Sequence, residues 1–288
     1  MKLSVSLVTY QHIQTAEEAI NSVLDQQTVF PFEIIVGDDA STDGTRDLLE
    51  FHRARHPVRI RLLLHDTNAG DYGLTNVMST MDAASGEYVA FLDGDDFWTS
   101  PDKLQKQVDF LDAHPDCAIC AHRVEHLHDD GVRILSAGAP QGTGTYPVGA
   151  LIARNFAPKI STVVRKSALA DLPEWYRRTT VASADWVLNV LASRKARVGF
   201  IDEVLAVHRV HSASVSAGYG AEKMFADKLK ILPVLQELVP EASDELNRLR
   251  RQLRMKKFVA GCSPRVFSVL RRIGGLTRTQ PEDQGIRG

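Results

Sequence analysis

Three carboxylates follow a hydrophobic run in the N-terminal half of the chain. The run, 87–92, has the pattern of a strand, and Asp93, Asp95 and Asp96 come directly after it around Gly94. Because residues i and i+2 of a strand project to the same face, we expect Asp93 and Asp95 to point at one place. Two carboxylates there suit a hard cation, Mn²⁺ or Mg²⁺, of the kind that bridges to substrate phosphates. The alternative is a polar turn, since Asp-Gly is a common turn dipeptide, but a turn does not require three acids.

Strand and helix patterns alternate around these residues. Strands are predicted at 3–9, 32–36, 60–64 and 87–92. Helices are predicted from a capping box at Thr15, at 45–56 and 73–84, and from Ser100-Pro101 as N-cap and N1. This alternation predicts an α/β fold with a mainly parallel sheet and helices on both faces. Such sheets bind ligands beyond the carboxyl ends of their strands. The polar residues of the chain collect there, at Thr9-Tyr10, Asp38-Asp39, Asn68-Ala69-Gly70 and Asp93-Gly94-Asp95.

The composition is that of an ordinary globular protein. The 288 residues are enough for one large domain or one domain with an appendage. A formal net charge of −2 gives no reason to expect a nucleic-acid partner. No apolar stretch approaches the ~18 residues of a membrane span, and the first residues do not resemble a secretory signal. Three cysteines, an odd number, argue against a disulfide framework and predict a cytoplasmic location.

Some residue patterns are interpreted as structural. Cys117 and Cys120 form a nominal C-x-x-C pair in an apolar run without a second pair, so we expect core residues. His122, His126 and His128 lack cysteine partners at zinc-site spacing and are expected to be scattered strand and surface residues. The chain has no G-x-G-x-x-G after its first strand and no G-K-[ST] phosphate loop. A phosphorylated ligand is therefore expected to be neutralised by a metal at the acidic cluster.

On these residues the chain resembles the family 2 glycosyltransferases, which are inverting, nucleotide-sugar-dependent enzymes with the A-type glycosyltransferase fold. The resembling segments are 5–11, 22–26, 33–45, 68–70, 92–96, 184–186 and 208–211. The resemblance implies a catalytic domain over about 1–215, with a nucleotide-sugar-binding half at 1–100 and an acceptor-side half at 101–215.

The resemblance also implies roles for single residues. The donor-binding residues would be Thr9, Tyr10, Asp38, Asp39, Asn68, Gly70, Asp93 and Gly94. Among them, Asp39 would hydrogen-bond the base and Asp93 would lie near the ribose. Asp95 would bind a Mn²⁺ or Mg²⁺ ion together with Asp93, and His211 would approach the metal or the diphosphate. The donor would be a nucleotide sugar, with a UDP-sugar favoured.

Asp185 is the implied general base, but its surroundings depart from the family pattern. The preceding residue is Ala184, where many relatives have Glu, and Val8 stands where Pro is common. From its position before an apolar helical pattern, Asp185 is equally a helix N-cap, and both roles are compatible. The segment 155–164 resembles the acceptor side of the family and carries no transferable chemistry.

The composition changes after about residue 215. Helices are predicted at 221–238 and 242–259, within a C-terminal extension over 216–273, and a disordered tail is predicted at 274–288. From Arg248 to Arg272 there are nine Lys or Arg residues and no acid, interleaved with apolar residues. This pattern fits a peripheral contact with the inner face of a membrane, which would favour a lipid-linked acceptor over a free saccharide. A helix that braces the catalytic domain fits equally well.

The sequence therefore predicts an inverting, metal-dependent glycosyltransferase of cell-surface polysaccharide or glycoconjugate biosynthesis. The alternative enzyme is a sugar-phosphate nucleotidyltransferase, which is disfavoured because the N-terminal glycine-rich, basic phosphate loop of that class is absent. A non-catalytic nucleotide- or carbohydrate-binding module is the remaining alternative, mainly because of Ala184. The sugar, the base beyond a lean to uridine, the acceptor and the oligomeric state are left open.

Overall fold

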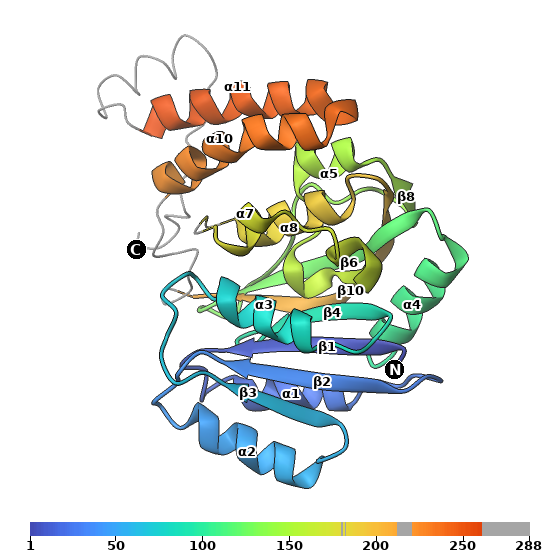
Figure 1. Ribbon diagram of the computed structural model, residues 1–288, viewed down its shortest axis with the longest axis vertical. Coiled ribbons are helices and arrows are strands. Elements are labelled where there is room, and N and C mark those ends of the chain that lie inside the picture. The colour runs from blue at the N-terminus through green and yellow to red at the C-terminus, as the bar shows by residue number, and fades with distance from the viewer. Residues whose placement is uncertain (180, 182, 212–220, 261–288) are drawn as a thin grey trace, which may run out of the picture.

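The computed structural model describes residues 1–179, 181, 183–211 and 221–260 (Figure 1). Within these residues one ten-stranded sheet has the order β3-β2-β1-β4-β9-β6-β10-β5, with β7 paired to β6 and β8 paired to β10. The strands are β1 (Leu3–Thr9), β2 (Phe32–Asp38), β3 (Ile60–Leu64), β4 (Tyr88–Asp93), β5 (Phe97–Trp98), β6 (Cys117–His128), β7 (Arg133–Leu135), β8 (Gly144–Tyr146), β9 (Val163–Arg165) and β10 (Arg197–Val210).

Helices cover both faces of the sheet, as predicted (Figure 1). They are α1 (Ala16–Leu24), α2 (Thr45–Arg55), α3 (Leu74–Ala83), α4 (Lys103–Ala113), α5 (Val148–Arg154), α6 (Lys166–Leu169), α7 (Glu174–Arg177), α8 (Ala184–Ala192), α10 (Ala221–Leu238) and α11 (Ser243–Ala260), with short 3₁₀ turns η1 (Lys159–Ser161) and η2 (Pro240–Ala242). Buried residues of α1, α2 and α4 belong to one core cluster, and those of α3, α5 and α8 belong to the other.

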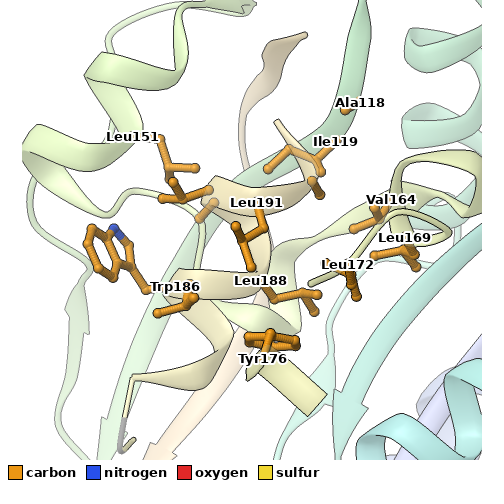
Figure 2. Packing of buried hydrophobic residues seen from close by; sticks show 14 of the residues in the cluster. Ala118, Ile119, Leu151, Val164, Leu169, Leu172, Tyr176, Trp186, Leu188 and Leu191 are labelled. Carbon is orange, nitrogen blue, oxygen red and sulfur yellow. The ribbon is translucent and has the colours of Figure 1, made fainter. Parts of the chain in front are cut away.

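The period of two along the strands produces these two cores. In β4, Val89 and Phe91 pack with α3 and α8, whereas Ala90 and Leu92 pack on the opposite face with α1 and α4. Figure 2 shows part of the core cluster that contains α3 and α8. In this view Leu188 of α8 lies near Tyr176. Because both faces are covered, the residues of β1 and β4 are nearly all buried on both faces, and most of them are apolar.

The sheet is mainly parallel, with one short antiparallel strand in its middle. β3, β2, β1 and β4 are parallel neighbours, and β10 runs parallel to β6. Between these two groups, β9 pairs antiparallel with both β4 and β6. The strand β9 therefore joins the nucleotide-side and acceptor-side halves of the expected domain through main-chain hydrogen bonds.

Two predicted helix starts are wrong in detail. Thr15 occupies the N-cap position of α1, but its side chain makes no capping bond, because its hydroxyl donates to the Gly94 carbonyl at 2.8 Å instead. The helix α4 begins at Lys103 with Asp102 at the N-cap position, two residues later than Ser100-Pro101 predicts. There the Ser100 hydroxyl contacts the Asp102 carboxylate, so the first residues form a turn before the helix.

A buried polar group links α4 to the middle of the sheet. Lys103 is completely buried, and its Nζ donates to Gln107 Oε1 at 2.8 Å. Gln107 Nε2 in turn donates to the carbonyls of Cys120 (2.6 Å) and Ser161 (2.8 Å). Cys117 and Cys120 are buried free thiols, and burial raises the pKa of Cys117 to about 11. These cysteines are core residues, as predicted.

The predicted C-terminal helices are present as α10 and α11, which stack on the acceptor side of the molecule (Figure 1). Leu246 and Leu253 of α11 are buried and belong to the core cluster that contains α5 and α10. The inner face of α11 therefore braces the fold. No helix in the described part of the chain is long and apolar enough to cross a membrane. The predicted boundary near residue 215 and the tail at 274–288 lie outside the described residues.

Candidate active site

The carboxyl ends of three neighbouring strands bring the predicted site residues to one edge of the sheet. In the strand register Thr9 lies opposite Asp38, and Val8 lies opposite Asp93. The last residues of β1, β2 and β4 are therefore at the same height. This alignment follows from parallel pairing, which places equivalent ends together.

The acidic segment leaves the sheet through a tight turn at Gly94. The β4 strand ends at Asp93, and the Asp96 amide then donates to the Asp93 carbonyl at 3.1 Å. Asp95 therefore lies on this turn, and the expectation that Asp93 and Asp95 share a strand face is wrong. The turn nonetheless brings the side chains together, because carboxylate oxygens of Asp93, Asp95 and Asp96 all lie within 4.8 Å of one another.

Gly94 is clamped between the end of β1 and the start of α1. Its amide donates to the Val8 carbonyl at 2.8 Å, and its carbonyl accepts the Thr15 hydroxyl. A Cβ at this position would lie 2.7 Å from both His12 Nδ1 and Thr9 Cγ2. Only glycine fits here without moving its neighbours, so the acidic turn has a fixed position.

Asp95 lies between two imidazoles. The Nε2 atoms of His211 and His12 lie 3.1 Å and 4.0 Å from Asp95 Oδ2. Burial acts to raise the pKa of Asp95, but the nearby His12 and the hydrogen bond with His211 outweigh it and hold that pKa below its ordinary value. The carboxylate is therefore ionised at neutral pH. The predicted neighbourhood of Asp95 and His211 is present.

Asp96 anchors the turn to β10. Because Phe97 pairs with Val207, the buried Asp96 faces the following residues of β10. It lies 3.0 Å from His208 Nδ1 and accepts the Arg209 amide at 2.8 Å. Burial raises the pKa of Asp96 to about 6. Burial also acts to lower the pKa of His208, but the hydrogen bond of His208 with Asp96 outweighs it and raises that pKa to about 9. Asp96 and His208 therefore form a buried ion pair at neutral pH.

Lys159 supplies a cation that the sequence analysis missed. Its Nζ forms an ion pair with Asp93 Oδ1 at 2.5 Å. Burial opposes the charge on Lys159, but Asp93, Asp185 and Asp95 outweigh it and raise the pKa of the lysine. The segment 155–164 was expected to carry no transferable chemistry, and this expectation is wrong for Lys159. Lys159 and Asp93 are 66 positions apart in the sequence, and no local sequence pattern predicts their contact.

Asp185 lies in the first turn of α8, whose N-cap position is Ser183. The prediction that Asp185 is the N-cap is therefore wrong. A carboxylate in the first turn is favourable to the helix dipole, but it leaves the side chain available for chemistry. Asp185 acts electrostatically on Lys159, which is paired with Asp93, and on Lys228 of α10. Asp185 and the acidic cluster therefore both act on the charge of Lys159.

Asp38 fixes the loop that follows β2. It is completely buried and accepts hydrogen bonds from Thr9 Oγ1 (2.9 Å), Ser41 Oγ (2.5 Å) and Arg46 Nε (2.8 Å). All of these partners are protein groups, so Asp38 shapes the donor side by holding the loop.

Asp39 joins this loop to the predicted Asn68–Gly70 segment. It accepts hydrogen bonds from Asn68 Nδ2 at 2.9 Å and from the Ala69 amide at 3.1 Å. Gly70 is exposed with a φ of +66°, a left-handed conformation that favours glycine. Tyr10 is 45% exposed beside this edge. These contacts bring Thr9, Asp38, Asp39 and Asn68 together at one edge of the sheet, and the contacts of the predicted donor residues with a donor stay a prediction.

A cavity of about 380 Å³ opens beside the acidic turn. Its lining comes from the loop after β1 and from the ends of β6 and β10, and includes His12, Asp95, His128, Arg209 and His211. Of the histidines expected to be scattered, His122 is buried, whereas His128 faces this cavity.

A larger cavity, of about 630 Å³, lies at the opposite end of β4. Two of its cations are already bound, Lys166 to the Ala84 carbonyl and Arg177 to both oxygens of Asp82. The chemistry therefore belongs to the smaller cavity.

The residues fit a divalent cation. Carboxylate oxygens are the ligands that Mg²⁺ and Mn²⁺ prefer, and an imidazole nitrogen is compatible with Mn²⁺. Asp93 and Asp96 have cationic partners in Lys159 and His208. Asp95 has the imidazole of His211, a group that can itself ligate a metal. Asp95 and His211 are therefore the residues best suited to hold a cation.

Comparison with known proteins identifies a family model and similar sequences. The model of the family "Glycosyl transferase family 2" matches residues 4–169. An uncharacterized protein of Mycobacterium tuberculosis is 35% identical over 214 residues, which cover 74% of this chain and 60% of that protein. The chain thus spans less than two thirds of this relative.

Two solved structures share the architecture. TarS of Staphylococcus aureus, a poly(ribitol-phosphate) β-N-acetylglucosaminyltransferase, is 26% identical over 294 residues, which cover 99% of this chain and 47% of TarS. The crystal structure of TarS with UDP-GlcNAc matches with a TM-score of 0.71 at 20% identity. The match covers 93% of this chain and 76% of the TarS chain in that crystal.

The mannosyltransferase PcManGT of Pyrobaculum calidifontis, in complex with GDP-Man and Mn²⁺, matches with a TM-score of 0.60 at 17% identity. The match covers 95% of this chain and 79% of the PcManGT chain. At these identities the likeness is one of fold.

Proposed function

The chain belongs to glycosyl transferase family 2 and has the predicted A-type fold, and we propose that it transfers a sugar, with inversion, from a nucleotide-sugar donor to an acceptor hydroxyl. The observation that carries the proposal is the meeting of Asp95, His211 and Asp93 at the carboxyl edge of the sheet. The Asp39–Asn68 contact lies on the proposed donor side of the same edge, and Asp185 acts electrostatically on Lys159, the ion-pair partner of Asp93.

The loops after β1, β2 and β3 are the proposed donor pocket. In this proposal Asp39 hydrogen-bonds the base, and its bonds to Asn68 and Ala69 support it by fixing the loop at the rim of the pocket. Thr9, bonded to Asp38, forms the floor. A UDP-sugar is the favoured donor, in keeping with the bound UDP-GlcNAc of TarS.

Asp95 and His211 are the proposed cation ligands, with Asp93 beside them. When bound, Mn²⁺ or Mg²⁺ would offset the negative charge that develops on the departing diphosphate. The Mn²⁺ ion in the PcManGT complex supports this choice. Lys159 holds Asp93 in place and adds a positive charge at the same edge.

Asp185 is the proposed general base. The acceptor hydroxyl must lose its proton as it attacks the sugar, and a positioned carboxylate typically contributes ~10²–10⁴-fold by accepting it. Ser183 rather than Asp185 occupies the N-cap position of α8, which leaves the Asp185 carboxylate available. We propose a cell-surface polysaccharide or glycoconjugate as the product, in keeping with TarS, a poly(ribitol-phosphate) β-N-acetylglucosaminyltransferase.

The test is a donor screen with the purified protein and natural nucleotide sugars, with and without Mn²⁺. Release of a nucleoside diphosphate from one donor, faster with a saccharide or lipid-linked acceptor, is the expected result. Release of pyrophosphate from a nucleoside triphosphate and a sugar phosphate would instead identify a nucleotidyltransferase. Binding of a nucleotide sugar without any turnover would identify a non-catalytic module.

A further inference from the structure

The last described helix has an inner and an outer face of different character. The inner face of α11 carries Leu246 and Leu253, which are buried against the rest of the fold. The outer face is exposed and basic, with Arg248, Arg251 and Arg254, while Lys256 and Lys257 are exposed on the flanks of the helix. The acids of the helix, Asp244 and Glu245, are confined to its first turn. The positive charge is therefore concentrated in the last three turns.

This charge is not neutralised within the described residues. None of the five exposed cations has a carboxylate of the described chain within ion-pair distance, whereas cations elsewhere, such as Lys106 and Arg177, do. Arg250, on the flank of the helix, donates to Gln236 of α10 instead. Three arginines on the outer face, with two lysines on its flanks, form a local anion-binding surface on a protein whose net charge is −2.

Two large apolar side chains share this face. Met255 is 50% exposed and Phe258 is 64% exposed, next to Lys256 and Lys257. A polyanion such as nucleic-acid backbone would contact the cations and leave these side chains in water. An anionic lipid surface uses both, because the cations meet the headgroups while Phe and Met enter the apolar boundary. We propose that the outer face of α11 docks on an anionic phospholipid surface.

The docking face is connected to the acceptor side of the site. Lys256 lies 6.0 Å from the centroid of the Phe225 ring of α10. On the same helix, Lys228 lies over the Trp186 ring at 5.2 Å and interacts electrostatically with Asp185. Figure 1 shows α10 and α11 stacked as a pair over the helical layer that contains α8. If the proposed function is correct, docking would present the Asp185 side of the site to acceptors carried by the lipid surface.

The first test measures co-sedimentation of the full chain with vesicles. Phosphatidylcholine vesicles serve as the neutral probe, and the same vesicles with phosphatidylglycerol serve as the anionic probe. We expect salt-sensitive binding to the anionic vesicles and little binding to the neutral ones. Each cation near the surface contributes about 1 kcal/mol, or about fivefold in affinity. The triple variant Arg248→Gln, Arg251→Gln, Arg254→Gln should therefore lose on the order of a hundredfold.

The matched control removes three exposed cations at the other end of the molecule, in Arg53→Gln, Arg55→Gln, Arg61→Gln. These residues belong to α2 and β3. The control has the same net charge as the α11 triple variant, and it should retain binding. Equal losses in the two variants would show that only net charge matters and would overturn the proposal, as would equal binding to neutral vesicles.

The second test separates lipid from other polyanions. Phe258→Ser should weaken binding to anionic vesicles, whereas Phe51→Ser, at a residue that is 53% exposed on α2, should not. Competition by polyuridylic acid together with unchanged vesicle binding of Phe258→Ser would assign the face to nucleic acid and overturn the proposal. The melting temperature of each variant is measured first, since exposed positions should leave it unchanged. Donor binding in the α11 triple variant should equal that of the wild type, so a failure of docking is distinguishable from a failure of the proposed transfer.

Discussion

Replacing the buried Lys103 with Met should stabilise the protein at neutral pH. The side chain is completely buried, its Nζ donates to Gln107 Oε1, and it lies 4.0 Å from the centroid of the Trp98 ring. No carboxylate among the described residues forms an ion pair with it. Burial therefore lowers the pKa of Lys103 from its ordinary 10.5 to about 7. Methionine has a similar length and flexibility without the amine.

The magnitude follows from the two pKa values of this lysine. Between pH 7 and 10.5 the unfolded chain binds a proton that the folded chain releases, so the free energy of unfolding rises with pH. At pH 7 the lost stability is about 4 kcal/mol, and about 2 kcal/mol of it returns by pH 9. The Met variant avoids this cost but leaves Gln107 Oε1 without its donor, at about 1 kcal/mol or more. The net gain at pH 7 is on the order of 2–3 kcal/mol, and it should shrink towards zero by pH 9.

Urea unfolding of both proteins at pH 7 and pH 9, followed by circular dichroism, measures this difference. Titrations common to the two proteins cancel in the subtraction. Lys195→Met, at an exposed lysine, is the control and should show no pH-dependent difference. A Lys103→Met variant whose stability relative to wild type is the same at both pH values would refute the reasoning, because the lysine would then have an ordinary pKa in the folded protein.

Three further predictions concern the site. Asp95→Ala should abolish both turnover and Mn²⁺-dependent donor binding measured by calorimetry, and full wild-type activity in excess chelator would contradict the proposed cation site. Asp185→Asn should slow transfer at least ~10²-fold with an unchanged melting temperature, because Ser183 occupies the N-cap position; a destabilised variant with a normal rate would exclude Asp185 as the base. Lys159→Met leaves Asp93 without its ion-pair partner. This variant should lower the free energy of unfolding by about 1–3 kcal/mol and weaken donor binding. If the free energy of unfolding and the donor affinity are both unchanged, the ion pair contributes to neither.

The sequence predicted the regular elements because their patterns are local. Residues 60–64 and 221–238 were assigned from apolar spacing alone, and β3 and α10 have those same bounds. The site edge was predictable for a related reason, since alternating strands and helices imply parallel strands whose carboxyl ends coincide.

The errors concern contacts between distant segments. Thr15 has the sequence of a capping residue, but the Gly94 carbonyl becomes its acceptor only when β4 lies beside β1. Lys159 meets Asp93 only because β9 inserts next to β4. A strand of three residues such as β9 is too short for its own periodicity to be recognised. The Lys159 and Thr15 contacts of this turn therefore required the structure, whereas the acidic cluster and its neighbour His211 were predicted from the sequence.

The position of β9 has a consequence for how the two halves of the protein can move. Many enzymes close on their substrates by rotating one lobe about a hinge between two separate cores. Here β9 is hydrogen-bonded to β4 on one side and to β6 on the other, so the sheet continues without a break from the donor side to the acceptor side. Rotation of one half against the other would break this ladder and shear two continuous cores. If the proposed transfer is correct, we expect movement on substrate binding in the loops at the carboxyl edge and not between the two halves of the sheet.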